Sequence, residues 1–95
     1  METLFVIYDE SLEPEISGII SREMVVSRYT RVDHIVGARM AEREATGFVA
    51  DRRNRLIILI AEPPTVAKLV DDLRDLRARK GRGLRAFVVK AETVL

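Results

Sequence analysis

The same succession of residues occurs twice in this chain, and it restricts the folds that the chain can adopt. Two short apolar runs, residues 4–10 (LFVIYDE) and residues 56–62 (LIILIAE), each end in an acid and correspond position by position. Runs of this length predict strands that are buried on at least one face. Residues typical of a helix start follow both runs, DES and then Pro14 in the first case and EPP in the second. The chain is therefore predicted to contain two strand–helix units.

Helical periodicity and further β-rich segments complete this pattern. Apolar residues recur at helical spacing after each of the two strands, at Leu12, Ile16, Ile19 and Ile20 and again at Val66, Leu69, Val70, Leu73 and Leu76. Gly81 is predicted to end the second helix, where a left-handed residue is favoured. The four strands are predicted over residues 4–8 (LFVIY), 25–36 (VVSRYTRVDHIV), 55–61 (RLIILIA) and 85–91 (RAFVVKA).

Two βαβ units with right-handed crossovers predict an α+β, ferredoxin-like βαββαβ fold. Its four-stranded antiparallel sheet carries both helices on one face, which leaves the other face uncovered. Since every strand is rich in aliphatic residues, we expect another subunit to cover that face. Residues 37–54, between the second and third strands, are too many for a hairpin turn. They either contain a helix or extend the two strands as a protruding arm, and Phe48 and Val49 are its candidate partner contacts.

The composition is that of one ordered domain, residues 1–95, with 47% hydrophobic and 33% charged residues. The lack of cysteine excludes disulfides, thiolate metal sites and cysteine nucleophiles. No apolar run approaches the about 20 residues needed to cross a bilayer, and the N-terminus has no signal-peptide pattern. We therefore expect a cytoplasmic protein without membrane insertion.

Positive charge is concentrated before the last strand. Residues 74–85 carry six bases and one acid, whereas the first 15 residues carry five acids and no base. The bases in the helix also fit its C-terminal dipole, but Arg82 and Arg85 lie beyond the helix. There, Gly81 and Gly83 leave the backbone free to direct N–H groups at an anion. The segment KGRGLR (80–85) therefore predicts a phosphate-binding loop.

Other chemistries find little support in the sequence. A catalytic triad needs a histidine oriented by a carboxylate, and the single histidine, His34, is compatible with a metal ligand or with an ordinary strand residue. Nucleotide-binding glycine motifs that open a helix are missing. RGLRAFVV is superficially similar to the aromatic RNA-recognition motif, but it falls on the fourth predicted strand and contains only Phe87 as an aromatic. We predict a non-enzymatic protein that does not bind nucleic acid.

The order and spacing of four segments resemble the PII-like signal transduction proteins, the superfamily of trimeric nitrogen regulators. These segments are LFVIYDESL (4–12), YTRVDHIVG (29–37), NRLIILIAE (54–62) and GLRAFVVKAETVL (83–95). The resemblance runs over essentially the whole chain. It implies a homotrimer whose uncovered sheet faces pack together, with a regulatory role toward a membrane transporter or a metabolic enzyme through the segment 37–54.

The resemblance also implies a nucleotide site between subunits, where the long T-loop and the basic B-loop of one subunit meet the chain end of another. ADP, ATP and AMP, and also bicarbonate, are the ligand candidates, and no cofactor is required. The B-loop corresponds to Gly81, Arg82, Gly83 and Arg85, and the base of the T-loop to Gly37, Ala38 and Arg39. Thr30 corresponds to a threonine near the adenine.

Two departures from the family pattern and two alternatives stay open. The segment 37–54 lacks the tyrosine that is uridylylated in the nitrogen regulators, and the given sequence stops before the arginine-containing segment that reaches the nucleotide. The first alternative is a CutA-like or metal-efflux-associated trimer that binds a divalent metal through His34 and acidic residues. The second is an ACT-like module that senses an amino acid at a subunit interface.

Overall fold

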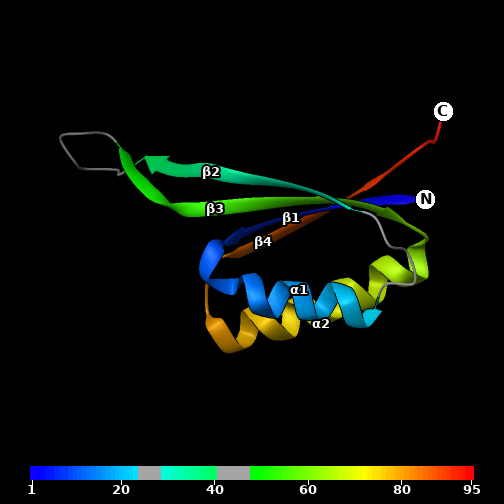
Figure 1. Ribbon diagram of the computed structural model, residues 1–95, viewed down its shortest axis with the longest axis horizontal. Helices are drawn as coiled ribbons and strands as arrows, with labels where there is room; N and C mark the ends of the chain where they lie inside the picture. The colour runs from blue at the N-terminus through cyan, green and yellow to red at the C-terminus, as the bar shows by residue number, and fades with distance from the viewer. Residues whose placement is uncertain (24–28, 41–47) are drawn as a thin grey trace.

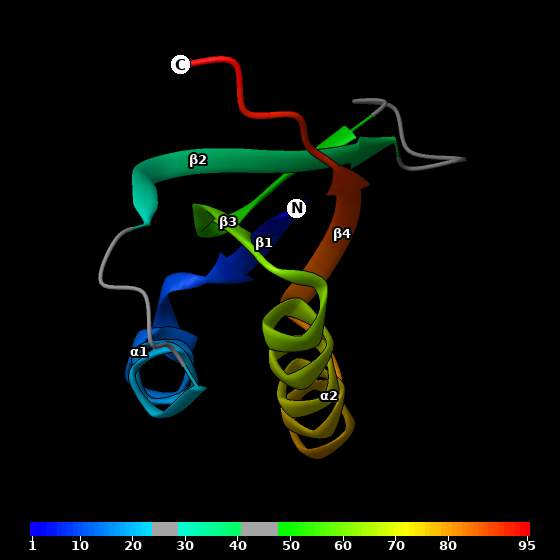
Figure 2. The ribbon, with the colours of Figure 1, turned by 90° about the vertical axis from the view of Figure 1, so that its right-hand side faces the viewer.

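The computed structural model describes residues 1–23, 29–40 and 48–95. Its elements are β1 (Glu2–Asp9), a 3-10 turn η1 (Glu10–Leu12), α1 (Glu13–Glu23), β2 (Thr30–Met40), β3 (Phe48–Ala61), α2 (Pro63–Lys80) and β4 (Leu84–Lys90). The four strands form one antiparallel sheet in the order β2-β3-β1-β4. Both helices lie on the same side of that sheet (Figures 1 and 2). The predicted ferredoxin-like βαββαβ fold is confirmed.

Both helices begin where the sequence predicts, and α2 also ends where predicted. The side chain of Asp9 accepts a hydrogen bond from the Ser11 N–H at 2.9 Å, which caps the turn that leads into α1. Prolines occupy the first turn of α2, and Gly81 ends that helix with φ of +84°, while its N–H donates to the Arg77 carbonyl at 2.7 Å. Within the described residues, neither helix is long and apolar enough to cross a membrane.

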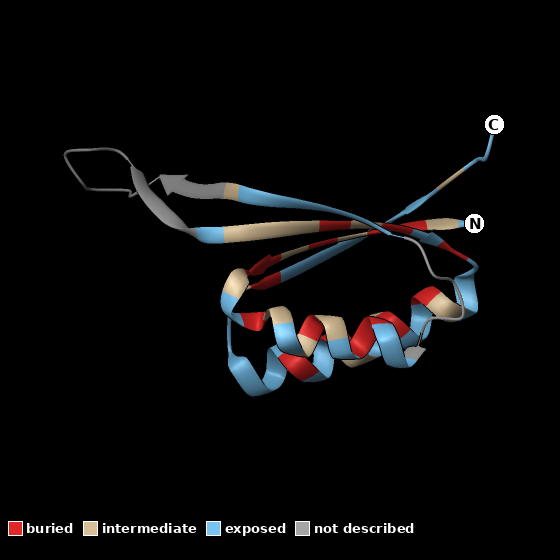
Figure 3. Cartoon of the chain, in the orientation of Figure 1, coloured by how far each residue is buried: buried red, intermediate tan, exposed pale blue. Residues whose placement is uncertain are grey.

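The hydrophobic core lies between the sheet and the two helices (Figure 3). Alternate residues of the central strands point into it because side chains alternate across a strand. The strands contribute Leu4, Val6, Tyr8, Ile57, Leu59, Ala61 and Leu84, and the helices contribute Ile16, Ile19, Ile20, Val66, Leu69, Leu73 and Leu76. All the apolar positions predicted for the helices are in this core or packed against it.

The opposite face of the sheet is apolar and uncovered, as predicted. Phe5 of β1 pairs in register with Ile58 of β3 and with Phe87 of β4. Ile60, Phe87 and Val89 are 46%, 48% and 52% exposed. We call this surface the open face; it includes Val32, Leu56, Ile58, Ile60, Phe5, Ile7, Phe87 and Val89.

The second strand continues further toward the C-terminus than predicted, and the third strand begins earlier than predicted. We predicted strands over 25–36 and 55–61, whereas β2 spans Thr30–Met40 and β3 spans Phe48–Ala61. Residues 37–40 and 48–54 pair across the two strands, with Ala38 opposite Ala50. Of the two alternatives for the segment 37–54, strand extension is therefore the one observed at both ends, while residues 24–28 and 41–47 lie outside the described ones. Cross-strand pairing satisfies backbone groups that a loop would leave to solvent.

A bulge in β2 interrupts the regular alternation of side chains. In a regular strand, the neighbours Asp33 and His34 would point to opposite faces. The pairing instead shifts between Val32 and Ile35, and His34 has φ of +60°. Regular alternation therefore does not hold at this position, because a bulge inserts an extra residue into one strand.

Candidate functional site

The segment between α2 and β4, which we call the glycine loop (residues 80–85), has an unusual backbone. Gly81 and Gly83 have φ of +84° and +85°, values that side-chain-bearing residues rarely adopt. The carbonyl of Gly83 accepts a hydrogen bond from the Asp9 N–H at 2.8 Å. A Cβ atom at Gly83 would lie 3.4 Å from Cβ of Asp9. The loop is thus pressed against the end of β1 in a conformation that requires glycine.

A shallow depression of about 300 Å³ lies beside the glycine loop. It is lined by Asp9, Ser11, Leu12, Lys80, Arg82 and Gly83. The Lys80 ammonium is 3.2 Å from the Glu15 carboxylate, whereas Arg82 is exposed and has no ion pair within the described part of the chain. Because Asp9 brings a carboxylate to the same depression, an anion would be attracted on the Arg82 side.

The other predicted B-loop residue, Arg85, belongs to the start of β4 and to the open face. Its guanidinium carbon lies 5.7 Å from the centroid of the Phe87 ring, within the range of a cation–π interaction. Arg85 pairs in register with Ile7, another open-face residue. Its charge therefore stands at the margin of an apolar surface, close to the glycine loop.

The glycine loop and the base of the segment 37–54 lie at the same end of the sheet (Figure 1). One row of residues connects them: Ile35 of β2 pairs with Asn54 of β3, Asn54 pairs with Asp9 of β1, and Asp9 bonds to Gly83. Gly37, Ala38 and Arg39 follow this row along β2, and Phe48 and Val49 pair with Met40 and Arg39.

Two other predicted residues are placed differently. Thr30 is exposed at the start of β2, opposite Ile58, and two strands separate β2 from β4. Within one chain, Thr30 is therefore not brought to the glycine loop. His34 is exposed in the bulge of β2, and the described residues contain no group of three or more histidine, aspartate or glutamate residues that could hold a metal ion.

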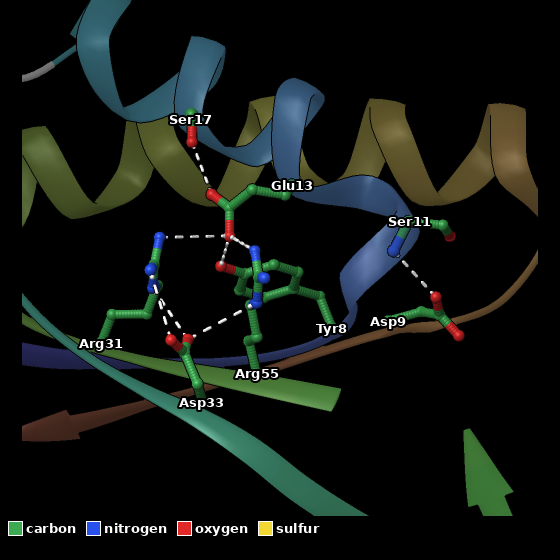
Figure 4. A network of polar contacts seen from close by, with 8 residues as sticks. All are labelled: Tyr8, Asp9, Ser11, Glu13, Ser17, Arg31, Asp33 and Arg55. Carbon is green, nitrogen blue, oxygen red and sulfur yellow. Dashed lines mark hydrogen bonds and ion pairs between the residues drawn. The ribbon is translucent and has the colours of Figure 1, made fainter. Parts of the chain in front are cut away.

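A second polar group, which sequence reasoning missed, lies under the start of α1 (Figure 4). The Glu13 carboxylate accepts hydrogen bonds from the Tyr8 hydroxyl at 2.7 Å, from the Ser17 hydroxyl at 2.5 Å and from the Arg55 guanidinium at 2.6 Å. Arg31 lies 3.6 Å from the same carboxylate. We call this group, together with Asp33, the polar cluster.

The charges of the polar cluster form a closed ring of alternating sign. Arg31 Nε is 2.9 Å from Asp33 Oδ1, and Arg55 Nε is 3.5 Å from the same oxygen. Burial alone would raise the pKa of Glu13, but hydrogen bonds from Ser17, Tyr8 and Arg55 outweigh it and hold that pKa below its ordinary value. Burial and the hydrogen bond to Glu13 raise the pKa of Tyr8. The cluster is neutral overall and internally satisfied.

On a helical projection alone, Glu13 and Ser17 lie outside the apolar stripe that contains Leu12 and Ile16. A signal for the cluster exists in the strands. Arg31 and Asp33, two positions apart, share the helix-covered face of β2, where a covered sheet would otherwise be apolar. Charged residues on such a face require partners, and Glu13 and Arg55 supply them.

Comparison with protein-family models finds no match, and comparison with curated proteins finds none either. Solved structures do match over most of the chain. One is the apo form of CPII from Thiomonas intermedia K12, a nitrogen regulatory PII-like protein, with a TM-score of 0.71 and 18% identity over 93% of this chain and 85% of that one. CPII bound to ADP, AMP and acetate gives a TM-score of 0.69 and 18% identity over 92% and 81% of the two chains.

A PII-like signaling protein from Thermus thermophilus also matches, with a TM-score of 0.65 and 12% identity over 93% of this chain and 83% of that one. These likenesses cover 92–93% of the present chain. The chain has the fold of the PII-like proteins.

Proposed function

We propose that this chain is a non-enzymatic PII-like regulatory protein. It binds an adenine nucleotide, or a similar small anion such as bicarbonate, at the glycine loop, and it acts on a transporter or metabolic enzyme through the segment 37–54. The observation that carries the proposal is the glycine loop itself. Two glycines with positive φ flank Arg82 at the end of the sheet where β2 and β3 extend beyond the body. The same fold binds ADP, AMP and bicarbonate in CPII from Thiomonas intermedia K12.

The glycine loop suits phosphate for physical reasons. Backbone N–H groups beside glycine can approach an anion closely, because no Cβ stands in the way. Arg82 and Arg85 add guanidinium groups that donate two hydrogen bonds to one phosphate. Gly37, Ala38 and Arg39 extend β2 from the same end of the sheet, and in this proposal their backbone contacts the ligand as well.

The proposed assembly is a homotrimer formed through the open face. A chain of 95 residues buries only a small hydrophobic core. Burying the exposed side chains of Ile60, Phe87 and Val89 against another subunit would add to the buried apolar area. The assembly also accounts for Thr30. Since this residue is remote from the glycine loop of its own chain, it can contact the ligand only at the loop of a neighbouring subunit.

Isothermal titration of ADP, AMP and ATP tests the proposal. Arg82→Glu and Arg85→Glu each replace a donor with a repelling charge, so we expect affinity to fall at least roughly tenfold, since a hydrogen bond to a charged group contributes about 1.5–3 kcal/mol. Gly83→Val should also weaken binding, because its φ of +85° is strained for valine. The exposed helix residues Arg74 and Arg77 provide matched charge controls, Arg74→Glu and Arg77→Glu.

Light scattering on each variant distinguishes a loss of ligand binding from a loss of assembly. This check is needed because Arg85 borders the open face. Binding that falls equally in all four arginine variants and decreases steeply with salt would indicate general electrostatics instead of a built site. A wild-type protein that binds none of the three nucleotides, or an Arg82→Glu variant and an Arg85→Glu variant that bind as well as wild type, would contradict the proposal.

A further inference from the structure

We infer that the polar cluster is the joint that fixes the direction of the extended strands relative to the glycine loop, with Glu13 as its positioning residue. The extended strands, called the arm here, are residues 35–40 of β2 and 48–54 of β3. The inference about geometry depends only on the described contacts. Its consequence for ligand affinity rests on the proposed function.

The strand ladder is irregular at the point where the arm begins. Val32 pairs with Leu56 and Ile35 with Asn54, so Asp33 and His34 both face Arg55. Two residues opposite one define a β-bulge, which interrupts the ladder and bends the strand. A second irregularity follows between Val36 and Ala38. Beyond the row of Arg55 only the row of Asn54 still pairs with β1, so contacts outside the ladder can contribute to the direction of the arm.

The polar cluster supplies such contacts at the bulge. Arg31 precedes the bulge, Asp33 lies within it, and Arg55 stands opposite on β3. All three connect to the first turn of α1 through Glu13, at 2.6 Å from Arg55 and 3.6 Å from Arg31. Figure 4 shows the Glu13 side chain reaching from the helix toward both guanidinium groups. The cluster therefore connects both strands of the arm to the body of the protein.

The same contacts determine where the arm stands relative to the glycine loop. Tyr8, which donates to Glu13, pairs in register with Arg55 on one side and with Leu84 on the other. The next residue, Asp9, bonds to Gly83 and caps the turn before α1. The joint and the glycine loop are thus direct neighbours in the sheet.

Burial and charge favour a positioning role over a ligand site. The Glu13 and Arg55 side chains are 20% and 24% exposed, so salt screens their pairing less than it screens a surface pair. Both guanidinium groups already have carboxylate partners, which leaves no net charge to attract a further ion. What the ring does provide is a set of directional bonds among three elements, α1, β2 and β3.

The direction of the arm can be measured without any ligand. Because the chain has no cysteine, spin labels can be placed at Ala50→Cys on the arm and Ala78→Cys on the exposed side of α2. Labelled protein diluted with an excess of unlabelled protein reports distances within one chain. We expect a narrow distance distribution in the wild-type background and a shifted, broader one in Glu13→Ala. Glu13→Gln keeps the side-chain size and should give an intermediate distribution.

The matched control is Glu15→Ala, which removes an acid of the same helix whose partner is Lys80, away from the bulge. Its distribution should equal that of wild type, and circular dichroism checks that every variant is folded. Identical distributions in wild type, Glu13→Ala and Glu13→Gln would overturn the inference. So would equal broadening in Glu15→Ala, since that would indicate a general loosening of α1.

Nucleotide titration then links the joint to the proposed site. We expect Glu13→Ala to lower ADP affinity by roughly 2- to 30-fold, the range over which residues outside a site modulate it, although Glu13 is not itself a proposed ligand contact. If the direction of the arm changes and the ADP affinity does not, the inference about the joint stands, and the arm does not contribute to binding. If wild type binds no nucleotide, the proposed function fails, and the distance measurement alone decides the inference.

Discussion

The two faces of the sheet are built from the same kinds of residue and differ in what covers them. Leu59 and Ile58 are neighbours in β3, yet Leu59 is 1% exposed beneath the helices, whereas Ile58 lies partly exposed on the open face. A strand that is apolar on both sides is typical of burial on both sides. The helices account for one side only. The neighbouring subunit of the proposed assembly would cover the other side, and predictions can be made for each face separately.

The largest effect is expected on the covered face. Leu59→Ala removes a buried side chain at the centre of β3, in register with Leu4. We expect the free energy of unfolding to fall by about 2–5 kcal/mol, since both transfer energy and cavity formation contribute. Urea denaturation measures this loss as a lower midpoint with an unchanged slope. A loss below about 1 kcal/mol would mean that the core tolerates the cavity and that the contrast between the faces is overstated.

A smaller and different effect is expected one residue away. Ile58→Ser removes apolar surface from the open face, where only the remaining exposed part of the side chain can be buried by another subunit. We expect about 1 kcal/mol of association energy to be lost per subunit, with little change in the fold of each chain. Light scattering over a dilution series should show dissociation at higher concentration than in wild type. A wild-type protein that is monomeric at micromolar concentration would contradict the proposed assembly.

The sequence predicted the fold because its local signals agree with one another. The apolar runs at 4–10 and 56–62 became β1 and part of β3, and Gly81 ended α2 where predicted. The bounds of β2 and β3 were missed for a physical reason. Residues 37–40 and 48–54 are stabilised by pairing with each other, and that partnership between distant residues leaves no periodic apolar pattern in either segment alone.

The candidate site was only partly predictable for a similar reason. The glycine loop could be found because Gly81 and Gly83 stand beside bases in one short segment. The spacing of Arg31 and Asp33 hints at the polar cluster, but its partners could not be predicted. Glu13, Asp33 and Arg55 come from separate elements that only the fold brings together. A helical projection placed Glu13 in solvent, since it considers one helix and ignores the strand edge beneath it.

The covered face becomes polar at its β2 edge, where Glu13 lies. We therefore expect the stability of the fold to depend on pH. The pKa of Glu13 in the folded chain lies below its ordinary value of 4.5, so the ionised carboxylate stabilises the fold above that pH. The contribution is lost as pH falls through the lowered pKa. We expect the stability difference between wild type and Glu13→Gln to be largest near about pH 7 and to shrink below about pH 4.5. Urea titrations across this range measure it, and a constant difference would exclude a lowered pKa at Glu13.

The smallest expected change in stability concerns the helices that cover one face of the sheet. Gly18 lies in the middle of α1, is exposed, and a Cβ atom there would meet nothing within 4 Å. Gly18→Ala should therefore stabilise the fold by about 0.5–1 kcal/mol, because alanine loses less backbone entropy in a helix. Gly83→Ala is the matched control, and it should destabilise because a φ of +85° is rarely adopted by residues with a side chain.

Thermal denaturation should show a higher melting temperature for Gly18→Ala and a lower one for Gly83→Ala. Light scattering should find the association of Gly18→Ala unchanged, because α1 lies on the side of the sheet away from the open face. This pairing separates the two faces by their energetics: a change in the helix layer should raise the stability of each chain without altering how chains associate. Tighter or weaker association in Gly18→Ala would mean that the helices also take part in the contact between subunits.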